Sequence, residues 1–417
     1  MGYYDCLMAP NHINVGRRDL LKVGGAAGLT ALAGCSSFGG GGGSDTYTIG
    51  MVDSQTGSLS EFGTRNERGR ELALADVNDV GVNGGELAIS VGDSQSTNQA
   101  GVSAAQKLVN QEGVPFLIGA VGSGVSIAIY ESVINGTDVV QLSQNSTGPK
   151  LTEYPDLLRM SPTGKTQSKA ISDIVSEDGH DSVALTYINN EYGSGIADAF
   201  RDAYPGDIAY DAAHDQGQAS YSSIVTAMNE SGASAWVFIT YQPEFSTMAQ
   251  DAYDQGYGEG VTYYGADSVK GTNVIENTPE GSIDGMKIVA PSAAVDQENY
   301  KNFASTFEDE YGSAPTAWSA YTYDCVITAA LSVQAADEFT GSALGDVVRD
   351  VTRPSGEKVQ TYKAAHDILA DGGSASDVDY QGVSGPIDLD QNGDPAAYLQ
   401  VFEVQDHAYV STGFIST

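Results

Sequence analysis

The stretch Val114–Thr152 reads VPFLIGAVGSGVSIAIYESVINGTDVVQLSQNSTGPKLT, and it decides the fold that the whole chain is predicted to adopt. It opens with Val114–Ile118, a short, bounded run of large apolar residues that is typical of a buried parallel strand. The segment Gly119–Gly124 that follows is too rich in glycine for a strand or a helix. Val125–Val133 then restores apolar residues at helical spacing, so the order strand, loop, helix is predicted.

A second strand in this stretch ends in a similar loop. Asp138–Ser143 predicts a buried strand, and the polar loop Gln144–Gly148 (QNSTG) follows it. In open α/β sheets, ligands bind outside the carboxyl ends of the strands, where helix N-termini attract anions. We therefore predict that Ser123 and Thr147 form one half of a small-molecule site.

Strands and helices alternate along the rest of the chain. Further strands are predicted over Tyr47–Val52, Glu86–Val91, Ser182–Ile188, Ala235–Thr240, Val261–Tyr264 and Gly285–Ala290. Helices are predicted over Glu67–Asn78, Asn98–Gln111, Ser194–Ala203, Glu244–Gln255, Glu298–Tyr311, Ala317–Ala336, Leu344–Arg349 and Val359–Leu369. Such alternation indicates right-handed βαβ units, and hence an α/β fold of two doubly wound parallel-sheet lobes joined by a multi-strand hinge.

The predicted lobes are each built from two separate parts of the chain. Residues 46–158 and 291–394 make lobe 1, and residues 159–290 and 395–417 make lobe 2. The 417 residues, of which 41% are hydrophobic, are ample for two cores and too many for one ordinary domain.

The first 35 residues carry an export signal. Gly16–Lys22 (GRRDLLK) is a twin-arginine pattern, and the apolar stretch Val23–Gly34 is too short to span a bilayer but fits a signal peptide. Leu32–Cys35 (LAGC) resembles the lipobox of exported lipoproteins, which makes Cys35 the predicted lipid attachment point. Residues 36–45 are a flexible glycine-rich tether. A lipid-anchored protein at the extracellular face of the cell membrane, exported by the twin-arginine route, is expected.

The net charge of the chain restricts the partners that it can bind, and its cysteine content restricts its thiol chemistry. Against 19 Lys and Arg stand 55 Asp and Glu, so the formal net charge is −36 and nucleic acid is not an expected partner. The acids are scattered rather than clustered, which suggests a halophilic protein whose self-repulsion is screened by salt. Cys325 is the one cysteine outside the leader, and it is predicted to be buried and inert.

Motifs of catalysis are absent from the sequence. No G-x-S-x-G, H-E-x-x-H or phosphate-loop pattern occurs, and the five histidines are scattered. Asp388–Gly393 imitates the first half of a calcium loop, but Leu399 occupies the twelfth position, where a glutamate is needed. No enzyme activity, metal or cofactor is predicted.

Three further polar residues follow strands of the second lobe. Tyr192 and Tyr241 come after the strands Ser182–Ile188 and Ala235–Thr240, and Asp267 comes after Val261–Tyr264. Asp267 would pair with a cation while the hydroxyls of the first lobe hold an anion. A zwitterion of the size of an amino acid fits that polarity.

In this order of elements the chain resembles the solute-binding proteins of ABC importers, of type I fold and of the branched-chain amino acid (Leu/Ile/Val) family, with a leader of the haloarchaeal lipoprotein type. The matching segments are Asp53–Gly63 (DSQTGSLSEFG), Gly119–Ser123, Leu142–Thr152, Asn190–Gly195 (NEYGSG), Tyr241–Glu244 (YQPE) and Gly265–Ser268. The resemblance covers about residues 46–413. The family's disulfide pair is replaced here by Gln95 and Gly122.

The resemblance implies a set of ligand-binding residues. It places the carboxylate of the ligand on Ser123 and Thr147, its ammonium on Asp267, and a backbone contact on Asn145, with Ser146 beside it. It makes Tyr192, Tyr241, Phe62 and Trp318 the walls of the crevice.

The resemblance also implies a receptor that captures a small amino acid, expected to be branched-chain, and delivers it to a permease with ATPase subunits. An amide, urea or another organic solute remains an alternative ligand. A secreted hydrolase and the sensor domain of a receptor remain alternative classes.

Overall fold

The computed structural model describes residues 45–416. The predicted twin-arginine signal, Cys35 and nearly all of the tether lie outside these described residues. No helix within the described range is long and apolar enough to cross a membrane.

The first sheet is fully parallel and forms the centre of lobe 1. Its strand order is β2-β1-β3-β4-β5. The strands are β2 (Glu86–Asp93), β1 (Thr46–Asp53), β3 (Phe116–Gly119), β4 (Val140–Ser143) and β5 (Leu157–Arg159). Every residue of β3 and β4 is buried, as the unbroken apolar runs of the opening stretch predict.

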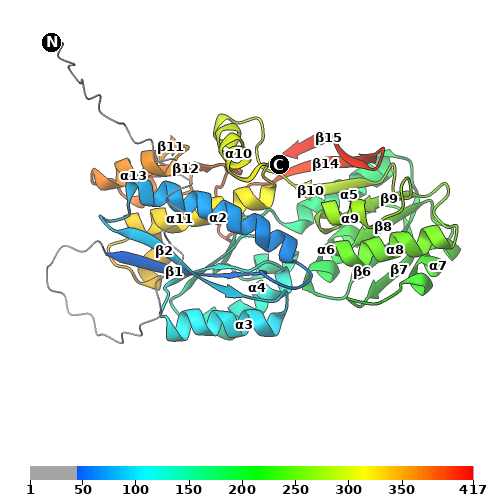
Figure 1. The fold of residues 1–417 in the computed structure, drawn as a ribbon, viewed down its shortest axis with the longest axis horizontal. Coiled ribbons are helices and arrows are strands. Elements are labelled where there is room, and N and C mark those ends of the chain that lie inside the picture. The colour runs from blue at the N-terminus through cyan, green and yellow to red at the C-terminus, as the bar shows by residue number, and fades with distance from the viewer. Residues whose placement is uncertain (1–44, 417) are drawn as a thin grey trace, which may run out of the picture. The chain divides into compact units, whose positions relative to one another are not determined.

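Helices cover both faces of this sheet. Figure 1 shows α2 and α11 on one side and α3 on the other. The helices of lobe 1 are α2 (Ser60–Val80), α3 (Asn98–Gln106), α4 (Ser123–Ile129), α10 (Glu298–Tyr311), α11 (Ala317–Ala335), α12 (Gly341–Val347) and α13 (Tyr362–Ala370). π-Helical turns at Lys107–Gln111 and Tyr130–Ile134 extend α3 and α4, and 3₁₀ turns lie at Pro149–Glu153 and Ala375–Asp377.

The second sheet forms the centre of lobe 2. Its strand order is β15-β14-β10-β9-β8-β6-β7. The strands are β15 (Ala408–Ser416), β14 (Tyr398–Gln405), β10 (Lys287–Pro291), β9 (Thr262–Gly265), β8 (Ala235–Ile239), β6 (Ser182–Ile188) and β7 (Asp207–His214). The five strands from β10 to β7 run parallel, whereas β14 and β15 form an antiparallel hairpin at one edge, which the predicted all-parallel sheet lacked.

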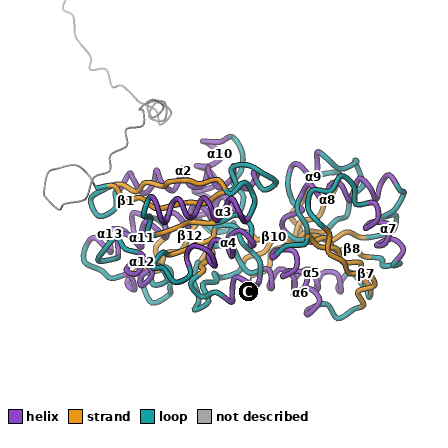
Figure 2. Tube along the Cα trace, turned by 90° about the horizontal axis from the view of Figure 1, so that it is seen from below, coloured by secondary structure: helices purple, strands orange, loops and turns teal. Residues whose placement is uncertain are grey.

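Figure 2 shows the strands of lobe 2 between α5 and α6 on one side and α8 and α9 on the other. The helices of lobe 2 are α5 (Gly164–Glu177), α6 (Glu191–Ala203), α7 (Ser222–Glu230), α8 (Gln242–Asp254) and α9 (Thr272–Glu276), with a 3₁₀ turn at Asp267–Val269. Buried apolar side chains such as Trp236 and Phe245 fill the face under α7, α8 and α9.

Three segments connect the two sheets. They are residues 160–163 after β5, residues 292–297 after β10, and residues 387–397 before β14. A small third sheet of β11 (Glu357–Val359), β12 (Val378–Gly382) and β13 (Gly385–Pro386) precedes the third segment. Apart from Arg159 and Pro291, which each lie one residue past a predicted boundary, the strands of the two large sheets fall in ranges predicted for different lobes. The lobe boundaries themselves stay a prediction.

The helix α2 begins earlier than the sequence predicts. It starts at Ser60, whereas the sequence predicts a start at Glu67. Gly63 permits the early start, because a Cβ there would lie 2.1 Å from the carbonyl oxygen of Ser54. As a result Phe62 is held on the first turn of a helix.

Candidate ligand-binding site

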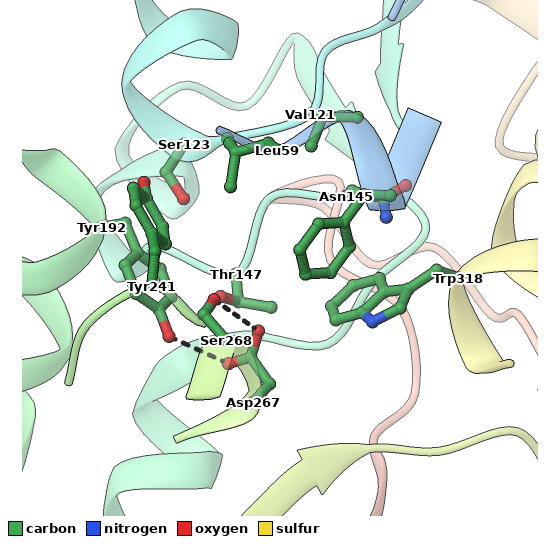
Figure 3. A pocket seen from close by; sticks show the side chains of 12 residues that line it. Leu59, Val121, Ser123, Asn145, Thr147, Tyr192, Tyr241, Asp267, Ser268 and Trp318 are labelled. Atoms are coloured by element: carbon green, nitrogen blue, oxygen red, sulfur yellow. Dashed lines mark hydrogen bonds between the residues drawn. The ribbon is translucent and has the colours of Figure 1, made fainter. Parts of the chain in front are cut away.

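A cavity of about 310 Å³ lies at the carboxyl ends of strands from both sheets, and Figure 3 shows its lining. Its lining contains Leu59, Phe62, Val121, Gly122, Ser123, Asn145, Thr147, Tyr192, Tyr241, Asp267, Ser268 and Trp318. Eight of the nine predicted ligand-binding residues are thus brought together, and their roles toward a ligand stay predictions.

Lobe 1 contributes hydroxyl groups whose protons are available to an acceptor in the cavity. Ser123 is the first residue of α4, which Gly122 allows the chain to enter at a φ of 92°. The Ser123 hydroxyl oxygen accepts the N–H of Gly148 at 2.9 Å, so its own proton is left for another acceptor. Within the described part of the chain, neither the N–H nor the hydroxyl of Thr147 has a hydrogen-bond partner. These groups are suited to hold a carboxylate.

Lobe 2 contributes a buried carboxylate, Asp267, which begins the 3₁₀ turn after β9. Its side chain accepts hydrogen bonds from Tyr192 OH at 3.3 Å and from Ser268 Oγ at 3.2 Å (Figure 3). It also accepts one from Gln167 Nε2 at 2.8 Å. Asp267 is only 5% exposed, and among the described residues no Lys, Arg or His lies within 4 Å of its carboxylate. Burial raises the pKa of Asp267 above its ordinary value, although the three hydrogen bonds oppose this rise.

Two tyrosines form the wall next to Asp267. Tyr192 lies in the first turn of α6 and Tyr241 immediately before α8. Their rings stack at 5.5 Å between centroids with 19° between planes. Asn190 Nδ2 donates to Tyr241 OH at 3.1 Å, and burial raises the pKa of both phenols, so both stay neutral donors.

The opposite wall is apolar. Phe62 from α2 and Trp318 from α11 meet edge to face, with centroids 5.6 Å apart and 72° between ring planes. Leu59 and Val121 extend this surface toward Ser123 (Figure 3). The lining of the cavity therefore combines hydroxyl groups, one buried carboxylate and an apolar wall.

Ser146 is the predicted residue that does not line the cavity. Its hydroxyl group bonds Ser126 Oγ at 2.8 Å and the carbonyl oxygen of Ala120 at 3.2 Å, behind the loop. Thr147, the next residue, lines the cavity instead. The carbonyl oxygen of Asn145 already accepts the N–H of Gly122 at 3.0 Å.

Four lining residues were not predicted, namely Leu59, Val121, Gly122 and Ser268. Each lies within one of the segments that carry the family resemblance, and this position in the sequence could have identified it as a lining residue. Cys325 is buried, as predicted. Asp390 in the calcium-like segment accepts the N–H groups of Asn392 and Asp394, which makes that segment a closed polar turn.

Two α/β lobes built on parallel sheets, with three connecting segments between them, are the fold of the type I periplasmic binding proteins. The chain belongs to the periplasmic binding protein family, whose model matches residues 46–408. The predicted fold class and family are therefore confirmed.

Three similar proteins illustrate this membership. The Leu/Ile/Val-binding protein homolog 3 of Brucella melitensis is 27% identical over 269 residues, which are 61% of this chain and 72% of that protein. The solved structure of the leucine binding protein LivK of Thermotoga maritima has a TM-score of 0.77 at 20% identity, with 88% of this chain and 98% of that chain covered. LivJ of Streptococcus pneumoniae, solved with isoleucine, has a TM-score of 0.76 at 21% identity, with 89% and 100% covered. All three are named as binding or substrate-binding proteins rather than enzymes.

Proposed function

We propose that this chain is the solute receptor of an ABC importer and that its ligand is a small amino acid with a branched apolar side chain. The observation that carries this proposal is Asp267, a buried carboxylate without a cationic partner among the described residues, facing the free hydroxyls of Ser123 and Thr147. The names of the relatives, which include Leu/Ile/Val-binding proteins, support the same class of ligand.

The burial of Asp267 favours a cationic ligand group. A buried charge is costly unless it is paired, and Gln167, Tyr192 and Ser268 supply only neutral donors to Asp267. An ammonium group would provide the missing charge. Phe62 and Trp318 line the same cavity and form an apolar wall against which the side chain of an amino acid would pack.

Two alternatives predict different chemistry in the same cavity. An amide or urea would donate neutral N–H groups to Asp267, but it would leave the apolar wall and the carboxylate-binding hydroxyls without a matching group. A hydrolase would need a nucleophile beside a base, and the lining contains neither His nor Cys. We infer that the protein makes and breaks no bond and works by closing around its ligand.

The proposal includes the cellular setting. Support for export by the twin-arginine route and for a lipid anchor at Cys35 comes from the ordered signals of residues 16–35. The net charge of −36 supports work at high salt. In this setting the receptor would pass its ligand to a permease with ATPase subunits at the outer face of the membrane.

Thermal unfolding of the purified protein in multimolar KCl tests the proposal. The ligands are the twenty amino acids, urea, short amides and, as a matched control, N-acetyl-leucine, which lacks the ammonium group. A ligand that binds only the folded state adds about 2.7 kcal/mol at a hundred times its Kd. A rise in the midpoint with Leu, Ile or Val but not with N-acetyl-leucine is expected. A rise with amides alone would overturn the zwitterion and keep the receptor.

A further inference from the structure

Arg159 is a buried arginine, and each of the three nitrogens of its guanidinium group donates a hydrogen bond. It is the last residue of β5 and has no exposed surface. Its Nε donates to Asp394 Oδ1 at 2.6 Å, and its Nη2 donates to Thr152 Oγ1 at 2.6 Å. Its Nη1 donates to the carbonyl oxygen of Gly148 at 2.9 Å and, more weakly, to that of Ser146 at 3.4 Å. No sequence motif had pointed to this residue.

The two carbonyls flank Thr147. The Ser146 carbonyl and the Thr147 N–H belong to one peptide group, and in a trans peptide these two atoms point in opposite directions. Ser161 Oγ donates to the Ser146 carbonyl at 3.1 Å and Arg159 Nη1 at 3.4 Å, so this carbonyl faces those two groups and the Thr147 N–H faces away from them. That N–H is the one without an acceptor in the described part of the chain.

The same arginine contacts the segments that connect the lobes. Asp394 lies in the third connection, residues 387–397, and Thr152 Oγ1 donates to its Oδ2 at 2.8 Å, which closes a three-residue cluster with Arg159. The backbone N–H of Arg159 also donates to the carbonyl oxygen of Gly393 at 3.0 Å. The loop that holds Thr147 is thus tied through one side chain to a segment that must bend when the lobes move.

We propose that Arg159 is a positioning residue for the carboxylate end of the ligand site. It holds the Ser146–Gly148 backbone so that Thr147 presents its N–H and hydroxyl groups to an anion, and Asp394 and Thr152 fix the guanidinium group in place. The proposal rests on the proposed function, because it takes the ligand to be a carboxylate-bearing amino acid.

The test compares Arg159→Lys with the matched control Arg201→Lys. Arg201 also forms a forked pair, with Asp211, but it lies on the far end of α6 from the cavity. Lysine keeps the charge and loses the fork, so a purely electrostatic role survives the substitution. Each protein is titrated with L-leucine and with L-leucinamide, which lacks the carboxylate, and its unfolding midpoint is recorded without ligand.

A positioning role predicts that Arg159→Lys weakens leucine binding by about tenfold or more and leucinamide binding by less than about twofold. Arg201→Lys should change neither affinity, even if its midpoint falls as far. Equal losses for both ligands, or no loss, would overturn the proposal, because general destabilisation does not distinguish a carboxylate from an amide.

Hydrogen exchange of the ligand-free protein provides a measurement that does not depend on the ligand. In Arg159→Lys, peptides that cover residues 144–152 should exchange faster than in the parent, while peptides from β8 should not. Unchanged exchange in 144–152 would overturn the positioning role. If the parent binds no amino acid, the proposed function fails, and faster exchange still supports the positioning of the loop.

Discussion

Replacing Asp267 by Asn should change ligand affinity and protein stability in opposite directions. Asparagine has nearly the same shape and keeps an oxygen that can accept from Gln167 and Tyr192, so the cavity should keep its form. Only the charge is removed. Because burial raises the pKa of Asp267, its ionised form is disfavoured in the folded protein, and the ligand-free variant should unfold at the same or a higher temperature.

The loss of affinity follows from the buried position. Removing one partner of a desolvated charge pair costs about 2–5 kcal/mol, which corresponds to a roughly 30- to 5,000-fold higher Kd for a zwitterion. The loss should depend on the ammonium group alone. 4-Methylpentanoate, which is leucine without its amino group, should bind the variant at least as well as it binds the parent.

Isothermal titration in multimolar KCl measures both ligands on both proteins. Asp178→Asn is the matched control, since Asp178 is an acid of lobe 2 that pairs with Lys287 and Tyr264 away from the cavity. The control should keep the preference for leucine over 4-methylpentanoate, and Asp267→Asn should abolish it. A preference that survives in Asp267→Asn would refute the ammonium role of this carboxylate.

Three further predictions follow from the surroundings of the site. In Gly148→Ala the new Cβ would lie 2.8 Å from Ser123 Cβ and Oγ, so calorimetry should show weaker leucine binding; unchanged affinity would mean that Ser123 does not contact the ligand. Gln167→Met removes the 2.8 Å donor to Asp267 and should raise the Kd for leucine by about tenfold, and an unchanged Kd would show that this donor does not position the carboxylate. Burial lowers the pKa of His214 from 6.5 to about 4. As the pH falls, the unfolded chain therefore binds the proton at a higher pH than the folded protein does. The stability that neutral His214 contributes above pH 6.5 is lost as the pH falls to about 4. Denaturant titrations should show that the free energy of unfolding falls by about 3 kcal/mol over this pH range. The fall should be absent in His214→Gln, and the same pH dependence in that variant would show that His214 is not its cause.

The strand ends that form the site could be predicted from the sequence because of the composition of the strands. The runs before Ser123 and Thr147 are apolar, short and bounded by glycine or polar residues, so only a buried parallel strand explains them. Asp267 and the two tyrosines follow runs of the same kind. The parallel topology then brings the residues of each lobe to one edge of its own sheet.

Other features depend on contacts that a local pattern does not contain. β7 alternates between exposed and half-buried residues at a sheet edge, and its sequence DIAYDAAH lacks the apolar run by which the other strands were found. The side on which Ser146 lies is decided by its bonds to Ser126 and Ala120, and the role of Arg159 by a partner 235 residues away. Such long-range pairs are visible only once the chain is folded.

A crystal structure of the protein with the amino acid selected by thermal unfolding tests the central claim most directly. The account predicts the ligand ammonium at about 2.7–2.9 Å from the Asp267 carboxylate, with the ligand carboxylate on Ser123 and Thr147 and its side chain against Phe62 and Trp318. A ligand bound in the reverse direction, or outside this cavity, would contradict it.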